Sequence, residues 1–343
     1  MKRGHAFTTS GFIDGRHNLR FVSSDNRPEW MQANPGAIDA SVQRALAQPS
    51  GGWFVVASSR SLRPHSLRRR AWTDLAASPR RFSVDGRDIV MWRPQPNAAL
   101  LAGPAACPHL GADLGTGHIS NGCLVCPWHG LGLTDRNHGA WKTFPVHDDG
   151  VLVWVQPQPS APDATDAPLI AKRPDIYLEG IVTRAVICEP CDIIANRLDP
   201  WHGTHLHPYS FRNLVVVDMA DDHIDMQVTY RIVGSQGVDV TARFHVPEPR
   251  TIVMTIVDGE GTGSVVETHA SPAVHAGPGR PPLTNVIEAI LVTSERPGFI
   301  YTLRGARIAR PLITFAANRL WTDDAAYAAR RYALRSSGWV PGQ

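Results

Sequence analysis

Two short cysteine–histidine pairs constrain the fold of this chain more than any other feature of its sequence. They are Cys107-Pro-His109 and Cys126-Pro-Trp-His129, and their spacing is C-x-H-x16-C-x2-H. A glycine follows each pair within two residues, and the surrounding segment has the pattern of short strands and glycine turns. Cysteine and histidine are common metal ligands, so the sequence predicts a metal centre on two loops of a small β-domain.

Two kinds of metal centre use these ligands. Tetrahedral zinc binds cysteine and histidine, and so does a [2Fe-2S] cluster in which two histidines replace two cysteines on one iron. The C-x-H pair is tighter than the turn that zinc sites favour, and Leu110 and Trp128 are suited to shield a redox centre. The sequence therefore favours the cluster, whose neutral imidazole ligands raise its reduction potential above that of all-thiolate clusters.

The segment resembles the Rieske iron–sulfur domain, because both pairs occur in order within short strands and glycine turns. The resemblance implies that Cys107 and Cys126 hold one iron of the cluster. It implies that His109 and His129 hold the other iron.

A second group of potential ligands lies in residues 196–208, where three histidines and an aspartate occur within about a dozen residues. Two histidines and one carboxylate form the metal site of non-haem Fe(II) enzymes that bind dioxygen. Helical spacing would pair His202 with His205, but Gly203 and Pro208 argue against a regular helix. The residues alone leave the choice of the second histidine open.

This stretch is similar to the D-x2-H-x4-H signature of Rieske-type non-haem iron oxygenases, which implies that His202 and His207 are iron ligands. The third ligand of that family is an aspartate in an acidic pair before a C-terminal helix. Here the pair is Asp323-Asp324, and its register favours Asp324, with Asp323 as the alternative. Ala329 departs from the family pattern, which often has glutamate at this position.

The resemblance also assigns roles to Asp199 and Asn196. An aspartate at the position of Asp199 bridges a cluster histidine of a neighbouring subunit to an iron-ligating histidine, and we expect His129 and His202 to be the bridged pair. Asn196 lies near the iron in such proteins. Asp199 also suits the first turn of a helix containing Pro200, and Asn196 also suits a structural hydrogen bond.

The strand and turn pattern predicts an α+β chain with two domains. Residues 1–49 form an N-terminal extension with a helix at 38–47. Apolar runs at 53–57, 82–92 and 150–155, with an Asp85-Gly86 turn, predict an antiparallel β-domain over residues 50–157. Residues 158–172 lie in a region rich in proline and small polar residues, and this composition predicts a linker.

Residues 173–343 are predicted to form the second domain. Alternating strands are expected at 223–233, 238–246, 250–257, 264–270, 285–293 and 299–303, followed by a helix at about 312–334. By resemblance, an all-β Rieske [2Fe-2S] domain precedes a helix-grip (START-like) antiparallel-sheet catalytic domain that holds mononuclear Fe(II).

Composition sets limits on location and partners. The cluster would use two of the five cysteines. We expect the other three, Cys123, Cys188 and Cys191, to be small buried side chains and not to form disulfides. We expect a cytoplasmic protein, because the N-terminus lacks a signal-peptide core and no run approaches the ~18 apolar residues of a membrane helix. The net charge of +3 indicates no nucleic-acid partner. The arginine-rich stretch 60–81 suits either an acidic ferredoxin or a solvated face.

The resemblance implies a terminal oxygenase component (alpha-subunit-like). Electrons from NAD(P)H would come from a separate reductase, with or without a ferredoxin, because the sequence has no flavin or nicotinamide fingerprint. A head-to-tail homotrimer is also implied. The enzyme would use O2 to hydroxylate, dihydroxylate or oxidatively demethylate an organic substrate.

Two questions stay open at the level of sequence. Apolar residues at 215–217 and 287–292 favour a large apolar substrate such as an isoprenoid, sterol or polyaromatic compound, with small aromatic acids as the alternative. A second class of function is a Rieske electron carrier or apolar-ligand-binding protein that lacks oxygen chemistry. The intact His202, His207 and acidic pair favour the oxygenase, whereas Ala329 weakly favours the second class.

Overall fold

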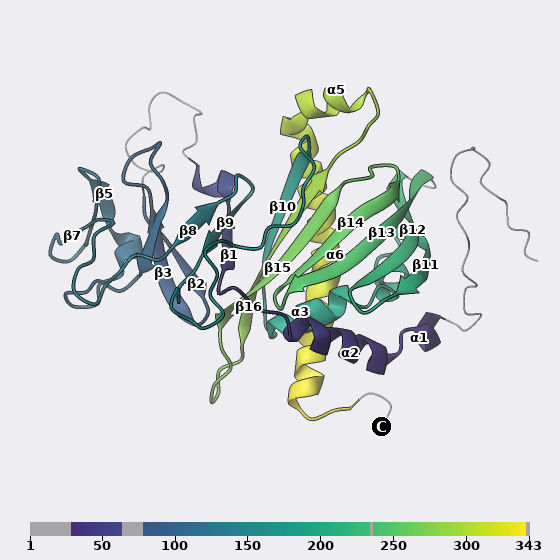
Figure 1. Ribbon diagram of the computed structural model, residues 1–343, viewed down its shortest axis with the longest axis horizontal. Coiled ribbons are helices and arrows are strands. Elements are labelled where there is room, and N and C mark those ends of the chain that lie inside the picture. The colour runs from purple at the N-terminus through teal and green to yellow at the C-terminus, as the bar shows by residue number, and fades with distance from the viewer. Residues whose placement is uncertain (1–28, 64–77, 234–235, 341–343) are drawn as a thin grey trace, which may run out of the picture.

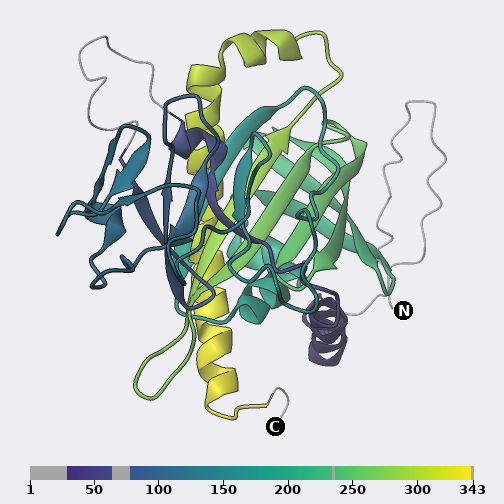
Figure 2. The ribbon, with the colours of Figure 1, turned by 60° about the vertical axis from the view of Figure 1, so that its left-hand side comes forward.

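The protein has a small β-domain beside a larger domain built on one curved sheet (Figure 1). The structure, a computed structural model, describes residues 29–63, 78–233 and 236–340. Helix α6 (Ala306–Ser336) runs lengthwise along the large sheet, as Figure 2 shows from a second side. No helix in these described ranges is long and apolar enough to span a membrane.

The small domain consists of short antiparallel strands. Within the described residues they form three sheets, whose strands in spatial order are β1 (Phe54–Ser58), β9 (Leu152–Val155) and β8 (Val146–Asp148); β2 (Arg80–Val84), β3 (Arg87–Trp92) and β4 (Leu101–Pro104); and β5 (His118–Ser120), β6 (Cys123–Val125) and β7 (Gly132–Leu133). The predicted turn joins β2 to β3, and Asp85 and Gly86 both have positive φ, as a tight hairpin turn requires. Two 3-10 helices, η1 (Ser59–Leu62) and η2 (Leu114–Thr116), complete the domain.

The large domain is built on one antiparallel sheet. Its described strands, in spatial order, are β10 (Leu178–Val186), β16 (Leu283–Val292), β15 (Val265–Val274), β14 (Thr251–Gly259), β13 (Gln236–Glu248), β12 (His223–Val233) and β11 (Phe211–Met219). Every strand from β11 to β16 pairs with its neighbour in sequence, and β10 pairs with β16 and forms one edge of the sheet. Such hairpin connections keep one face of the sheet continuous, and α6 packs across that face.

Helices α1, α2 and α3 lie beside one end of this sheet (Figure 1), and α4 contacts β11. Their bounds are α1 (Glu29–Gln32), α2 (Pro35–Leu46), α3 (Pro190–Arg197) and α4 (His202–Leu206). The helix predicted at 38–47 lies in α2, which begins after the N-cap residue Asn34 and buries Ile38 and Val42 against Ile194 of α3. The described part of the N-terminal extension, from residue 29 on, therefore packs on the second domain, and residues 1–28 lie outside the described residues.

Residues 299–303, predicted as a strand, form helix α5 (Phe299–Arg304) instead. The run of aromatic and β-branched residues fits a strand, but β16 just before it is already paired on both sides, by β10 and β15. The chain leaving β16 turns into a helix, in which the Tyr301 N–H bonds to the Gly298 carbonyl. Helix α6 also begins earlier than predicted and continues through Pro311.

Arg173, just after the predicted linker, ties the two domains together. Its Nε and Nη2 donate to the Glu267 carboxylate in β15 at 2.5 and 2.8 Å. Its Nη1 lies 3.0 Å from Asp149, in the loop before β9. Because all three side chains are nearly buried, this pair of ionic contacts fixes how the small domain sits on the sheet.

Candidate functional site

The two cysteine–histidine pairs lie on loops with the same backbone geometry. The N–H of Cys107 and that of Cys126 each donate to the carbonyl five residues later, at 2.9 Å. The N–H groups of Gly111 and Gly130 bond back to the cysteine carbonyls, and both glycines have positive φ, of 79° and 72°. A glycine after each pair is therefore required by the turn itself.

The four side chains suit an asymmetric cluster. Cys107 and Cys126 are buried in the domain core, whereas His109 and His129 are exposed, with ring centroids 4.9 Å apart. Two inner thiols and two outer imidazoles form the donor set of a cluster whose histidine-bound iron faces the surface. Leu110 and Trp128 flank the histidines and are themselves 63% and 62% exposed.

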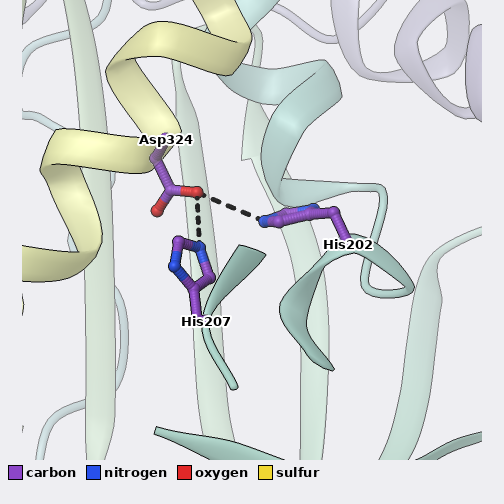
Figure 3. A group of neighbouring side chains, drawn as sticks. All are labelled: His202, His207 and Asp324. Carbon is purple, nitrogen blue, oxygen red and sulfur yellow. Dashed lines mark hydrogen bonds and ion pairs between the residues drawn. The ribbon is translucent and has the colours of Figure 1, made fainter. Parts of the chain in front are cut away.

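A second donor set converges between α4 and α6, where His202, His207 and Asp324 point toward one another (Figure 3). The Nε2 atoms of the two histidines lie 3.2 and 3.0 Å from Asp324 Oδ1. One ligand atom of each side chain lies within 4.8 Å of the others. This donor set is the two-histidine, one-carboxylate arrangement that leaves one face of a metal open.

The end of α4 determines which histidine faces Asp324. The helix stops at Leu206, and His207 has non-helical angles, with φ −120° and ψ 46°. The ring of His207 is thereby buried beside Asp324, whereas His205 is exposed. The helical spacing that pairs residues three apart thus does not apply across the helix end.

Asp323 lies behind His207 rather than among the three converging ligand atoms. Its Oδ2 accepts a hydrogen bond of 2.7 Å from the hydroxyl of Tyr209, which lies 3.2 Å from His207 Nδ1. The same carboxylate oxygen is 3.4 Å from His207 Nδ1. Tyr209 and Asp323 therefore hold the ring so that Nε2 faces Asp324, as outer partners of metal-binding histidines commonly do.

Asp324 is a buried carboxylate kept anionic by its neighbours. Burial by itself would raise the pKa of Asp324, but hydrogen bonds from His202 and His207 and the nearby charge of Arg197 outweigh it and lower the pKa below its usual value. Asn196 Nδ2 also donates to Oδ1, at 3.1 Å. Asn196 thus contacts the aspartate of this donor set.

Asp199 lies on the outer side of His202. Its Oδ2 accepts a 3.0 Å hydrogen bond from the Tyr327 hydroxyl and is 3.8 Å from His202 Nδ1. Asp199 Oδ1 and His202 Nδ1 are buried, and neither has a hydrogen-bond partner within the described parts of the chain. Buried polar atoms normally have hydrogen-bond partners, so these two atoms stand out at this edge of the site.

Tyr209, Tyr327 and Arg197 were missed by the sequence reasoning. Tyr327 carries a usable signal, because it lies three residues after Asp324 and so shares its face of the helix. No sequence pattern indicates that Tyr209 and Arg197 lie at the site, because only the folded chain brings them there.

A cavity of about 890 Å³ opens from the metal-binding residues. Its walls are mainly apolar, and residues 290–292 of β16 line it as predicted. The prediction for residues 215–217 was wrong, because Leu214 of β11 lines the cavity in their place. The register of β11 shifts between Arg212 and Val215, which changes the face on which the following side chains lie.

One further group of ligand-type residues is an ion-pair cluster. Asp192 is fully buried beside Glu189 and Cys191, and it accepts hydrogen bonds from Arg331 and Arg335. Burial raises the pKa of the Cys191 thiol to about 11. A protonated thiol and a carboxylate neutralised by arginine are poor metal ligands.

The remaining cysteines were predicted to be small buried side chains. Cys188 is buried, and burial raises its thiol pKa to about 12. Cys123 and Cys191 are half-buried. Most of the arginine-rich stretch 60–81 lies outside the described residues.

Two family models match the chain. Residues 52–158 match the Rieske [2Fe-2S] domain. Residues 160–339 match a family described as a domain of unknown function (DUF5914). The first match confirms the prediction of an iron–sulfur cluster over zinc.

Two curated proteins are similar in sequence over part of their length. Aminopyrrolnitrin oxygenase PrnD from Pseudomonas fluorescens is 31% identical over 116 residues, which cover 34% of this chain and 26% of PrnD. The oxygenase component of dicamba O-demethylase from Stenotrophomonas maltophilia is 29% identical over 162 residues, covering 40% of this chain and 47% of the relative. The chain thus spans less than half the length of these relatives.

Solved structures share the fold over most of the chain. Dicamba monooxygenase bound to dicamba superposes with a TM-score of 0.62 at 18% identity, covering 87% of this chain and 93% of that one. The terminal oxygenase of carbazole 1,9a-dioxygenase from Novosphingobium sp. KA1 gives 0.53 at 14% identity, covering 92% of each chain. The predicted α+β architecture is confirmed.

Proposed function

Because the chain belongs to the Rieske-type non-haem iron oxygenases, with a second domain of the DUF5914 family, we propose that it acts as a terminal oxygenase component. One observation carries the proposal: His202, His207 and Asp324 converge at the wall of a large apolar cavity in a chain that also has a Rieske domain. The family's cofactors are a [2Fe-2S] cluster and one mononuclear iron.

The residues of the chain prepare the metal site. His202, His207 and Asp324 would hold the iron, which supplies dioxygen activation when bound. Asn196 and Arg197 keep Asp324 in place and anionic. Tyr209 and Asp323 orient His207, and the apolar walls exclude water from the space beside the open face.

We infer a head-to-tail homotrimer as the working unit. In one chain β7, which follows the second cluster loop, lies at the left end of Figure 1, whereas α3 and α6 lie near the middle and strands β11 to β14 toward the right. A cluster can then serve the metal site of a neighbouring chain, and repeated heterologous contacts of this kind close into a ring. The exposed apolar side chains of Leu110 and Trp128 around the cluster histidines suit such a contact.

Asp199 is the proposed bridge across that contact. Its Oδ2 lies 3.8 Å from His202 Nδ1, and neither that nitrogen nor Asp199 Oδ1 has a hydrogen-bond partner in the described residues. A neighbour's His129 would donate to Asp199, and Asp199 would accept from His202. This chain of hydrogen bonds shortens the electron path between the two centres.

Electrons would come from NAD(P)H through a separate reductase, with or without a ferredoxin. We propose a cytoplasmic location for this system. The reaction would be hydroxylation, dihydroxylation or oxidative demethylation. A cavity of about 890 Å³ with apolar walls suits a large apolar molecule, of the size of a sterol, an isoprenoid or a polyaromatic compound.

Reconstitution tests this function. The purified chain would be combined with NADH and a surrogate reductase and ferredoxin, then given isotopically labelled dioxygen and a panel of apolar compounds. We expect labelled oxygen in at least one product, and none with the Asp324→Ala variant. A chain that exchanges electrons through its cluster but binds no second iron would instead support the electron-carrier function.

A further inference from the structure

The cavity wall is mostly apolar but also carries polar residues, among them Glu260, Ser294 and Arg296. Three further polar side chains form a patch next to the metal site. They are Arg197 at the end of α3, Thr268 in β15 and Glu288 in β16, and all three line the cavity. Thr268 and Glu288 lie directly opposite each other across the two strands. The patch is next to the metal site, because Arg197 Nη1 lies 3.8 Å from Asp324 Oδ2.

These side chains form a closed hydrogen-bonded group. Arg197 pairs with Glu288 through Nη2 and Oε2. Arg197 Nη2 and Nε also lie 3.2 and 3.3 Å from the Thr268 hydroxyl, which donates to Glu288 Oε2 at 2.9 Å. Glu288 is only 2% exposed and Thr268 only 1%.

Stability alone does not account for this group. Removing two charges from water costs several kcal/mol per ion, and apolar side chains of similar volume are often as stable or more stable. The surrounding wall is built of such side chains, among them Phe244, Ile252 and Leu291. Arg197 also lies 3.8 Å from Asp324, but no described hydrogen bond or ion pair joins Glu288 to Asp324, so support for Asp324 does not explain the glutamate.

The group offers one donor and one acceptor to the cavity. Both described contacts of Glu288 end on Oε2, and no hydrogen bond within the described residues reaches Oε1. Likewise no hydrogen bond in this part of the chain reaches Arg197 Nη1. The charges of Arg197 and Glu288 cancel, so the patch suits an uncharged group that both accepts and donates.

We propose that Arg197, Thr268 and Glu288 bind a hydroxyl group of an otherwise apolar substrate. The hydroxyl oxygen accepts from Arg197 Nη1, and its hydrogen is donated to Glu288 Oε1. A carboxylate cannot donate and is repelled by Glu288, whereas a pure hydrocarbon leaves both groups unpaired. Because the patch adjoins Asp324, the bound hydroxyl directs a nearby carbon toward the metal site.

This inference rests on the proposed function, and its test uses three probes that differ in one substituent: pyrene, 1-hydroxypyrene and 1-pyrenecarboxylate. Their binding to the anaerobic, iron-loaded full chain is followed by fluorescence at about pH 7, where the phenol is neutral and the acid is ionised. We expect 1-hydroxypyrene to bind about tenfold more tightly than either of the other probes.

Two variants separate charge from shape. Glu288→Gln removes the carboxylate that pairs with Arg197 in the patch and leaves Asp324 as the described anionic neighbour of Arg197. We therefore expect 1-pyrenecarboxylate to gain about tenfold in affinity and to become the preferred probe. The double variant Arg197→Met/Glu288→Met replaces the pair by apolar side chains and should keep pyrene binding while losing the preference for the hydroxyl. Met226→Leu, elsewhere on the wall, is the control and should shift all three affinities in parallel.

Iron content and thermal stability, measured on every variant, keep this result separate from the proposed function. Equal binding of the three probes by the wild type, or a hydroxyl preference that survives the double variant, would overturn the hydroxyl subsite even if the chain binds iron and consumes oxygen. A chain without the second iron that still prefers the hydroxyl probe would instead contradict the oxygenase function alone.

Discussion

At the scale of single residues, two adjacent carboxylates have different roles because a helix turns by about 100° per residue. Asp324 faces His202 and His207, while Asp323 faces Tyr209 and the outer nitrogen of His207. One carboxylate is thus placed to bind a metal, and the other is placed to orient a ligand.

This difference predicts unequal losses of iron. We expect Asp324→Ala to abolish iron binding at the second site, and Asp323→Ala to weaken it by roughly 10- to 100-fold, because it removes only an outer partner. Equilibration with graded chelator, followed by metal analysis, measures both. If Asp323→Ala lost iron as completely as Asp324→Ala, the assignment of the two aspartates would be wrong.

Substitutions of Asp199 and Tyr327 are expected to slow electron transfer and to leave iron binding intact. Asp199→Asn should keep both cofactors but slow NAD(P)H-dependent turnover by about 100-fold, because the bridge to His202 loses its charge. Tyr327→Phe removes the hydroxyl that positions Asp199 and should slow turnover by about tenfold, with cluster reduction unchanged. Normal turnover of Asp199→Asn with a full complement of both cofactors would rule out the bridge.

The sequence was sufficient to locate the two cysteine–histidine pairs on loops, because each pair is local and its turn needs the neighbouring glycine. The residues alone were insufficient to decide whether His205 or His207 faces Asp324, because that depends on where α4 ends. Arg197 and Glu288 are far apart in sequence and are joined only by the packing of α3 on the sheet. No local sequence pattern predicts such a pair.

At the scale of secondary structure elements, Arg173 connects the chain after the linker to both domains. Burial by itself would raise the pKa of Glu267, but hydrogen bonds from Arg173 and His269 outweigh it and lower the pKa. The pKa of Asp149 is lowered in the same way, against burial, chiefly by Arg173. Since both carboxyls have lower pKa values when folded, their stabilisation is present above their unfolded pKa values and is lost as the pH falls through the folded ones.

Arg173→Met should therefore lower the free energy of unfolding by about 3 kcal/mol at neutral pH, because it leaves two buried carboxylates unpaired. The wild type should lose stability as the pH falls below about 4, and the variant should lose less over the same range. Urea unfolding at several pH values measures both effects.

The control for this prediction is Arg60→Met. Arg60 also contacts a carboxylate, that of Glu179, but its side chain is 58% exposed, so its loss should cost under about 1 kcal/mol. Equal losses in the two variants would show that the contact of Arg173 does not hold the domains together.

Most elements of the fold followed from strand periodicity and turn residues, and the fold class was confirmed. The exceptions have physical reasons. Residues 299–303 have a strand-like composition but follow a strand that is already paired on both sides, and they form α5. Strand β10 was not predicted, because its pairing with β16 joins segments about a hundred residues apart. Periodicity describes a segment, whereas pairing depends on the rest of the sheet.

At the scale of the whole molecule, the proposed trimer predicts that chains with different defects restore each other. His129→Ala should disable the cluster, and Asp324→Ala should disable the metal site, so neither variant alone should turn over. Co-expressed chains should recover about a quarter of the wild-type rate per chain, which is the share of productive junctions in a randomly mixed closed ring. No recovery in mixed trimers of verified composition would mean that electrons pass within one chain.

The central claim is that one chain carries both a Rieske cluster and a mononuclear iron, and metal analysis tests it most directly. Iron and acid-labile sulfide would be measured in anaerobically purified wild type and His207→Ala, together with EPR of the reduced cluster. The account predicts about three irons and about two sulfides in the wild type, with about one iron lost and the cluster signal unchanged in the variant. Cluster iron alone in both proteins would contradict the oxygenase and leave an electron carrier or binding protein.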